Sequence, residues 1–258
     1  MIADWPAPDP GAAPMRRIVG AQAALELRTL IRNGEQLVLI LVIPVLLLVA
    51  FGHEALVSVG TGSRIDFVVP GILALAVMST AFTSLAIGTG FERRYGVLKR
   101  LGTSPLSRVG LIGAKTLTVL TVEAAQAVIV LVVGALLAWS PDARPAAVIW
   151  VPVLLLTGTA AFSGLALLLA GTLRAEATLA AANLLYIVML GLGGVLFPLT
   201  KFPAAAQPVL RLLPAGALSD GLRSVLAHSG GFPGTELLVL CVWAAAAIGA
   251  AARTFRWE

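Results

Sequence analysis

The sequence predicts an all-α integral membrane protein with six transmembrane helices, and its composition is the first observation behind that prediction. Of the 258 residues, 59% are hydrophobic and only 12% are charged, whereas about a quarter of the residues in soluble domains are charged. The mean hydropathy is +0.96, and apolar runs long enough to cross a bilayer recur along the chain. The single cysteine, Cys241, excludes a disulfide framework and a thiolate metal cluster.

The region before the first apolar run is predicted to have two parts. Residues 1–15 are acidic and rich in proline, so we expect a disordered tail; they lack the basic start and apolar core of a signal peptide. Residues 16–35 place Val19, Ala23, Leu27 and Leu30 along one helical face. This spacing predicts an amphipathic helix that lies in the membrane interface. Residues 36–258 then form the transmembrane domain.

Six apolar runs are the candidate spans. A helix needs about 20 residues to cross the hydrocarbon layer. The middle four runs meet that length, whereas the first and the last must include flanking residues. The runs cover residues 36–52, 67–90, 116–139, 145–173, 177–199 and 237–252.

The distribution of basic residues predicts the orientation of these spans. With six spans, 13 of the 18 Lys and Arg residues fall on one side of the membrane and five on the other. Because Lys and Arg accumulate in cytoplasmic loops, we expect both termini in the cytoplasm and the protein in the plasma (inner) membrane. The net charge of +5 is then explained by topology and by contact with anionic lipid, so we expect no nucleic-acid partner.

The loop over residues 91–108 is the most strongly basic segment, with five of the 18 Lys and Arg residues. Phe91, Tyr95, Leu98 and Leu101 follow one another at helical spacing and predict one apolar stripe. The sequence Thr103-Ser104-Pro105 is expected to end that helix. A short amphipathic helix of this kind would dock a cytoplasmic partner with its charged side; alternatively, lipid headgroups alone would anchor it.

The segment before the last span is predicted to be an outer re-entrant hairpin. Prolines at 198, 203, 208 and 214 prevent one continuous helix, so short helices over 204–212 and 215–227 are expected. Irregular backbone is not tolerated in hydrocarbon. The hairpin must therefore pack within the protein or lie in the headgroup layer.

Residue types that carry catalysis are scarce. The two histidines, His53 and His228, lie in the outer loops without a neighbouring cysteine or metal-binding motif. Residues 113–116 have a Lys-Thr pair but lack the glycine pattern of a phosphate-binding loop. We therefore expect no catalytic site, no metal site and no nucleotide hydrolysis by that motif in this chain.

Four polar residues within the apolar runs are the candidates for a transport path. They are Glu123, Gln126, Asn183 and Tyr186. A carboxylate at membrane depth should face the bundle interior or water. Interhelical hydrogen bonding is the alternative for all four.

The residues that carry a family resemblance lie in two segments. The first is the loop from Glu92 to Leu101, followed by Thr103-Ser104-Pro105-Leu106-Ser107-Arg108 and Lys115. The second comprises Phe197-Pro198, Phe202-Pro203, Leu213-Pro214 and Gly221-Leu222-Arg223. Over nearly its whole length the chain resembles a type-2 ABC exporter permease. Val97 and Lys99 depart from the small or acidic residues that are common in this family at those positions.

The resemblance implies a function and a set of partners. It implies export of a hydrophobic or amphiphilic substrate, such as a drug, a lipid or a lipid-linked glycan. It also implies a second permease copy or a paralogue, and a separate ABC ATPase subunit that binds ATP and Mg, with no cofactor in this chain. The basic loop would be the coupling helix on that subunit. Its implied contact residues are Phe91, Glu92, Arg93, Arg94, Tyr95, Gly96, Leu98, Lys99, Arg100, Thr103, Pro105, Leu106 and Arg108.

Two other classes of function stay open on the sequence. A proton-coupled secondary transporter would use Glu123 as its proton carrier and should show inverted repeats. A membrane-embedded enzyme, such as a lipid-modifying transferase or an intramembrane protease, would need clustered acidic residues or a Ser/His pair at membrane depth. A neighbouring reading frame with an ATP-binding motif would favour the ABC permease over both.

Overall fold

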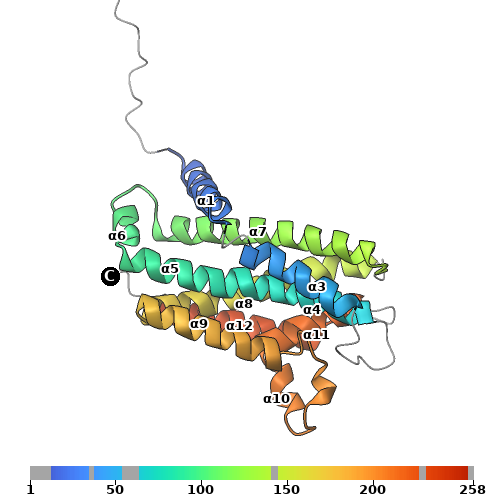
Figure 1. The fold of residues 1–258 in the computed structure, drawn as a ribbon. Coiled ribbons are helices and arrows are strands. Elements are labelled where there is room, and N and C mark those ends of the chain that lie inside the picture. Colours follow the sequence, from blue (N-terminus) through green and yellow to red (C-terminus); the bar gives the residue numbers. More distant parts are fainter. Residues whose placement is uncertain (1–12, 35–37, 54–63, 141–144, 227–230, 255–258) are drawn as a thin grey trace, which may run out of the picture.

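The structure is a computed structural model that describes residues 13–34, 38–53, 64–140, 145–226 and 231–254. Every regular element in these ranges is helical (Figure 1). Five helices there are long and apolar enough to cross a membrane. The first is formed by α4 (Arg64–Val77), η2 (Met78–Ser84) and α5 (Leu85–Arg94), which run on without a break. The others are α7 (Arg108–Leu136), α8 (Pro145–Thr172), α9 (Ala175–Leu192) and α12 (Gly234–Thr254).

The first predicted run, over 36–52, forms a shorter apolar helix than the other five. It consists of η1 (Val38–Val42) and α3 (Ile43–His53). α1 (Met15–Arg32) precedes it and packs on α7, where the hydroxyl of Thr118 donates to the carbonyl of Ala23 at 3.4 Å. Residues 1–12 of the predicted tail lie outside the described residues.

The prediction for the fifth span was too long, and the predictions for the second and third were too short. The apolar run continues to residue 199, but α9 ends at Leu192 because the following Gly194 has a left-handed φ of 67°. The second span extends to Arg94. The third begins at Arg108, where Ser107 caps the helix by accepting a hydrogen bond from the backbone N–H of Gly110 at 3.0 Å. Hydropathy does not detect these boundaries, because a helix can stop at a turn within an apolar run, as α9 does, and can continue through polar residues, as the second and third spans do.

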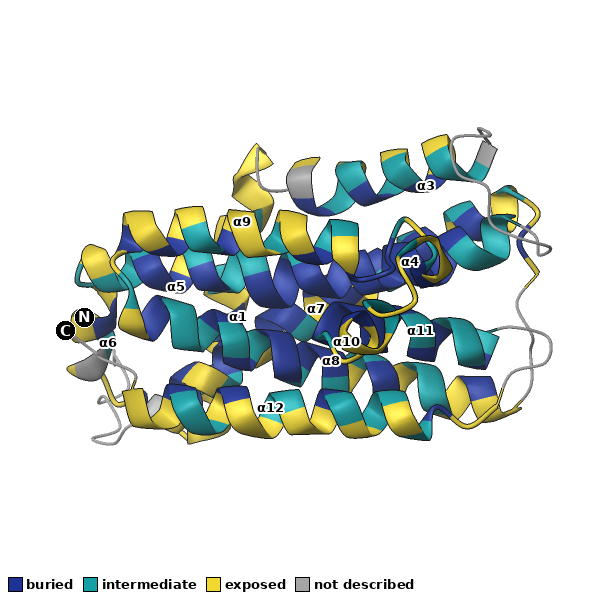
Figure 2. Ribbon diagram, turned by 90° about the horizontal axis from the view of Figure 1, so that it is seen from below, coloured by how far each residue is buried: buried dark blue, intermediate teal, exposed yellow. Residues whose placement is uncertain are grey.

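The span from Arg64 to Arg94 is the centre of the bundle. In its apolar window 78% of residues are buried, against 17% for α9 and for α12. It is surrounded by α3, α7, α8, α9 and α11 (Pro214–Leu226). Leu184 of α9 and Val242 of α12 are exposed, and Figure 2 shows exposed residues along both of these outer helices. Apolar faces of this kind are solvated by lipid or covered by another subunit.

The proline-rich segment folds into short helices, as predicted. They are η3 (Leu199–Lys201), α10 (Gln207–Arg211) and α11. α11 lies against α4, α8 and α12 and buries Leu218 and Leu222 completely. This segment lies in the half of the bundle away from α6 (Figure 1), and we call this part the α11 end.

Arg223 of α11 holds the α11 end together. Its guanidinium donates to the carbonyl of Val195 at 3.0 Å and to that of Phe67 at 3.2 Å. It also pairs with Asp220 at 3.2 Å and lies 3.7 Å from the centroid of the Phe67 ring. Irregular backbone after α9 thus obtains a hydrogen-bond donor inside the protein, which a buried carbonyl requires.

Candidate functional site

The opposite end of the bundle, which we call the α6 end, carries the basic loop. α5 ends at Arg94, and Gly96 adopts a left-handed φ of 69° that reverses the chain into α6 (Val97–Gly102) (Figure 1). The prediction of one apolar stripe from Phe91 to Leu101 is therefore wrong, because a helix that breaks at Gly96 cannot keep one face. Phe91 stacks on Tyr95 instead, with ring centroids 6.0 Å apart.

α6 is anchored by Leu98, which is 3% exposed. Leu98 packs with Leu106 and Leu111 in a small cluster that Ile18 and Val19 of α1 cover. This cluster ties α6 to α1 and to the start of α7. Leu98 and Leu106, predicted as partner contacts, are therefore internal anchors of the loop.

The turn between α6 and α7 is closed by its own side chains. The hydroxyls of Thr103 and Ser104 donate to the carbonyls of Arg100 and Leu101 at 2.8 Å and 2.6 Å. Pro105 follows on the exposed surface and prevents α6 from continuing. Arg108 is the first residue of α7, and its side chain lies outside the described part of the structure. The predicted helix end at 103–105 is confirmed.

Two of the predicted contact arginines tie the loop to another part of the bundle. Arg93 donates to the carbonyl of Leu173, and Arg94 pairs with Glu176 at the start of α9. Both interactions join the end of α5 to the turn between α8 and α9. The sequence offered no signal for this, since the residues involved are about 80 positions apart.

An ion cluster joins α7, α5 and α1 near the α6 end. The ammonium of Lys115 is 2.6 Å from a carboxylate oxygen of Glu92 and 3.5 Å from one of Glu26. Lys115 is buried, and the three residues come from α7, α5 and α1. Glu92, predicted as a partner contact, thus turns inward and neutralises a buried lysine. Glu26 was missed, although it is the only acidic residue among those of α1.

The outward surface of the α6 end is basic with an apolar centre. Tyr95 is 66% exposed and Val97 37% exposed. Lys99 and Arg100 are exposed beside them. The neighbouring helix ends add further exposed basic residues. These are Arg16, Arg17, Arg174 and Arg253.

Glu123 and Gln126 lie inside the bundle, one turn apart on α7. One oxygen of Glu123 accepts a hydrogen bond from Thr159 of α8 at 2.5 Å. Gln126, which is 2% exposed, accepts from Thr80 at 2.9 Å and donates to the carbonyl of Ile40 at 2.7 Å. It therefore joins α7 to the π-helical segments η1 and η2, where the altered backbone pairing makes carbonyls available to side chains.

Asn183 and Tyr186 lie together on α9 but differ in their surroundings. Asn183 is exposed, on the same helix face as Leu184 and Ile187. Tyr186 is half-buried and packs against the main core. Neither residue lies beside Glu123, so the structure does not bring the four candidates together into one site.

Comparison with known families gives a match over most of the chain. The sequence profile described as ABC-2 type transporter matches residues 21–227, which is most of the chain. The chain belongs to the ABC-2 type transporter family. No curated protein matches it with significance.

Membership of the ABC-2 family places the geometry in context. Members are membrane subunits of ABC transporters that work with an ATPase subunit, and they are not themselves hydrolases. The matched residues include α6, the Lys115 cluster and the short helices around Arg223. The chain is thus a multi-pass ABC transporter permease, and its α6 end carries its most strongly basic exposed loop.

Proposed function

We propose that this chain is the permease subunit of an ATP-driven exporter, which moves a hydrophobic or amphiphilic substrate outward across the plasma membrane. A drug, a lipid or a lipid-linked glycan would fit this class. The observation that carries the proposal is α6 itself, a short helix held from beneath by Leu98 that presents Tyr95, Lys99 and Arg100 outward.

The chemistry of this surface suits a protein partner. An exposed aromatic side chain ringed by basic residues is the composition of an interface centre, where Tyr and Arg contribute strongly to binding. The complementary surface on the ATPase subunit would be acidic, with a groove for Tyr95. Because α6 is anchored to α1 and α7, a movement of the ATPase would be passed to both helices.

The wider assembly follows from the same arrangement. Six spans with both termini in the cytoplasm would place the basic α6 end inside, in agreement with the distribution of Lys and Arg. The shorter helix η1–α3 would be the first span. The exposed apolar face of α9 would contact a second permease copy or a paralogue, since closed two-fold assembly is the commonest form of oligomer.

The test uses exposed residues of α6, so that the fold is left intact. We expect Tyr95→Asp, and separately Lys99→Glu/Arg100→Glu, to abolish co-purification of the ATPase subunit from membranes and ATP-dependent transport. Leu98 is unsuitable for this test, because a charge there would disrupt the permease itself. Bound ATPase is measured by mass spectrometry and by ATP hydrolysis in the purified complex.

Two controls give the experiment its meaning. Tyr95→Phe keeps the ring and should retain the partner, and Arg211→Glu changes an exposed arginine on α10, away from α6. Well-expressed Tyr95→Asp and Lys99→Glu/Arg100→Glu variants that still bind the ATPase and still transport would overturn the docking role of α6. Transport that follows a proton gradient without ATP would instead support the secondary-transporter alternative.

A further inference from the structure

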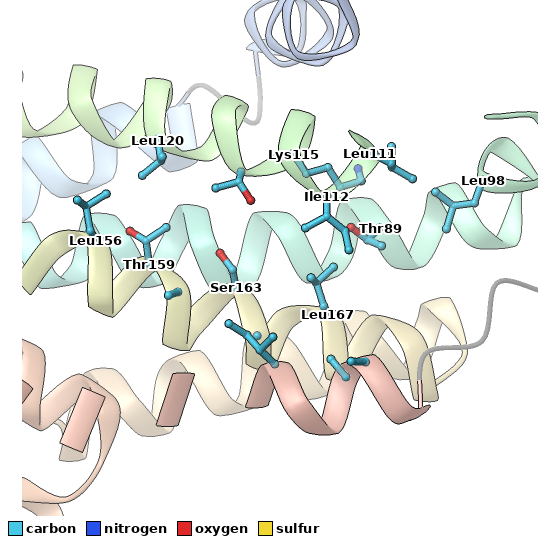
Figure 3. Close-up of a pocket in the computed structure, with 16 residues that line it drawn as sticks. Thr89, Leu98, Leu111, Ile112, Lys115, Leu120, Leu156, Thr159, Ser163 and Leu167 are labelled. Atoms are coloured by element: carbon cyan, nitrogen blue, oxygen red, sulfur yellow. The ribbon is translucent and has the colours of Figure 1, made fainter. Parts of the chain in front are cut away.

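An apolar groove runs between α7 and α8 inside the bundle. It contains a cavity of about 450 Å³ towards the α6 end and a second of about 290 Å³ beyond it. Leu120 of α7 and Leu156 of α8 line both cavities, so the two are neighbours. Figure 3 shows the lining side chains of the larger cavity pointing into the space between the two helices. Its volume lies within the range typical of small-molecule sites.

Glu123 places a carboxylate in this otherwise apolar groove. Its side chain lines the smaller cavity, and the residue is 8% exposed. One oxygen is held by Thr159, which lines the larger cavity. The other oxygen is buried and has no hydrogen-bond partner in the described part of the chain. A buried carboxylate oxygen without a partner is costly, and a ligand that donates a hydrogen bond would remove that cost.

The charge along the groove favours a cation. Lys115 and Glu123 are the charged residues among those described as lining the two cavities. Lys115 is already neutralised by Glu92 and Glu26, whose two carboxylates outnumber its single ammonium. The hydroxyls of Thr89 and Ser163, which also line the larger cavity, are buried and without a partner in the described residues. An anionic head group would therefore meet repulsion, and an apolar head group would leave the free oxygen of Glu123 without a partner.

We propose that this groove binds a cationic amphiphile, with its ammonium group on the free oxygen of Glu123 and its apolar tail in the larger cavity. Thr159 is the positioning residue, because it fixes the other oxygen of the carboxylate. Leu156 lines both cavities and is 52% exposed, so the groove reaches the outer surface of the bundle at this residue. The proposal rests on the proposed export function and names the substrate class for it.

The test measures binding to the purified full-length permease in phosphatidylcholine nanodiscs, without an ATPase. The probe is a twelve-carbon primary amine with a photoreactive diazirine in its tail. We expect crosslinks at residues that line the groove, including Leu120 and Leu156, and competition by unlabelled dodecylamine but not by dodecanol or dodecanoate. Glu123→Gln should lower this labelling by about tenfold or more, since it replaces a charge-assisted hydrogen bond with a neutral one.

Matched variants separate charge from folding. Glutamine at 123 can still accept from Thr159, so the α7–α8 contact is kept, while Glu236→Gln removes a carboxylate outside the groove and should label as the wild type does. Leu156→Trp keeps the carboxylate, fills the groove and should also abolish labelling. Melting curves of all variants report folding directly.

Three outcomes would overturn the proposal. They are equal labelling of the wild type and of Glu123→Gln, equal competition by dodecanol or dodecanoate, and displacement of the probe by phosphatidylethanolamine but not by dodecylamine. The last result would identify a bilayer lipid as the occupant. Because no ATPase takes part, each of these results leaves the coupling role of α6 untouched, and loss of that role would leave amine binding intact.

Discussion

At the α11 end of the bundle, Arg223 is turned into the protein and pairs with two carbonyls and a carboxylate. At the α6 end, Lys99 and Arg100 point outward beside an exposed Tyr95. Both ends are irregular, and both carry basic residues close to proline. Where the carbonyls of an irregular segment need a donor, a basic side chain stabilises the segment by donating to them. Where side chains within a turn already donate to its carbonyls, the basic side chain remains available for a partner.

The difference follows from how each end satisfies its backbone. The α6–α7 turn is completed by Thr103, Ser104 and Ser107, so it needs no long side chain from elsewhere. After α9 the carbonyl of Val195 instead accepts from Arg223, 28 residues further along the chain, and Gly71 of α4 approaches that carbonyl so closely that a Cβ atom would collide with it. Arg223 fills the role there.

The largest effect is expected at the α11 end. Arg223→Ala leaves the carbonyls of Val195 and Phe67 and the carboxylate of Asp220 without their donor. We expect the free energy of unfolding to fall by about 3 kcal/mol, measured by reversible unfolding in mixed micelles. Arg211→Ala on exposed α10 is the matched control and should change stability by less than about 0.5 kcal/mol. Equal stability of the two variants would show that Arg223 does not hold this end.

A smaller and more local effect is expected at the Lys115 cluster. Lys115→Met places the carboxylates of Glu92 and Glu26 together without a cation. We expect a loss of about 2 kcal/mol, which is less than the loss of about 3–5 kcal/mol for a fully buried pair because the side chains of Glu92 and Glu26 are partly exposed. Hydrogen exchange should become faster in α1 and at the end of α5. Adding Glu92→Gln to this variant should recover part of the loss. Lys99→Met is the control and should leave hydrogen exchange in α1 unchanged. Unchanged exchange in α1 of Lys115→Met would show that the cluster does not hold this helix in place.

The smallest effect concerns the glycine that turns the chain into α6. At Gly96 the left-handed backbone costs a residue with a Cβ atom about 1 kcal/mol, although a Cβ there meets no described atom within 4 Å. Gly96→Ala should therefore lower stability by that amount and weaken ATPase binding by redirecting α6. Gly88→Ala, within α5 and equally free of contacts, should be neutral or slightly stabilising. If both variants behaved alike, the geometry of this turn would not matter for docking.

Much of the fold could be predicted from the sequence, because membrane helices are recognisable by composition and length. The four middle apolar runs and the last one each correspond to a long helix, and the proline-rich segment from residue 198 forms the short helices η3, α10 and α11. The site was predicted less well. Leu98 and Leu106 proved to be internal, and Arg93 and Arg94 proved to pair within the chain.

The sequence by itself determined that this chain is a bundle of membrane helices with a basic loop at one end, since hydrophobicity and charge along a helix act locally. Only the tertiary structure decided which charged residues face inward. Glu92 and Glu26 meet Lys115 because three helices converge there. Thr159 of α8 donates to one oxygen of Glu123, and the other has no hydrogen-bond partner among the residues that the structure describes. A charge takes its role from neighbours that are distant in sequence, because the low-polarity interior makes each pairing strong and each missing partner costly.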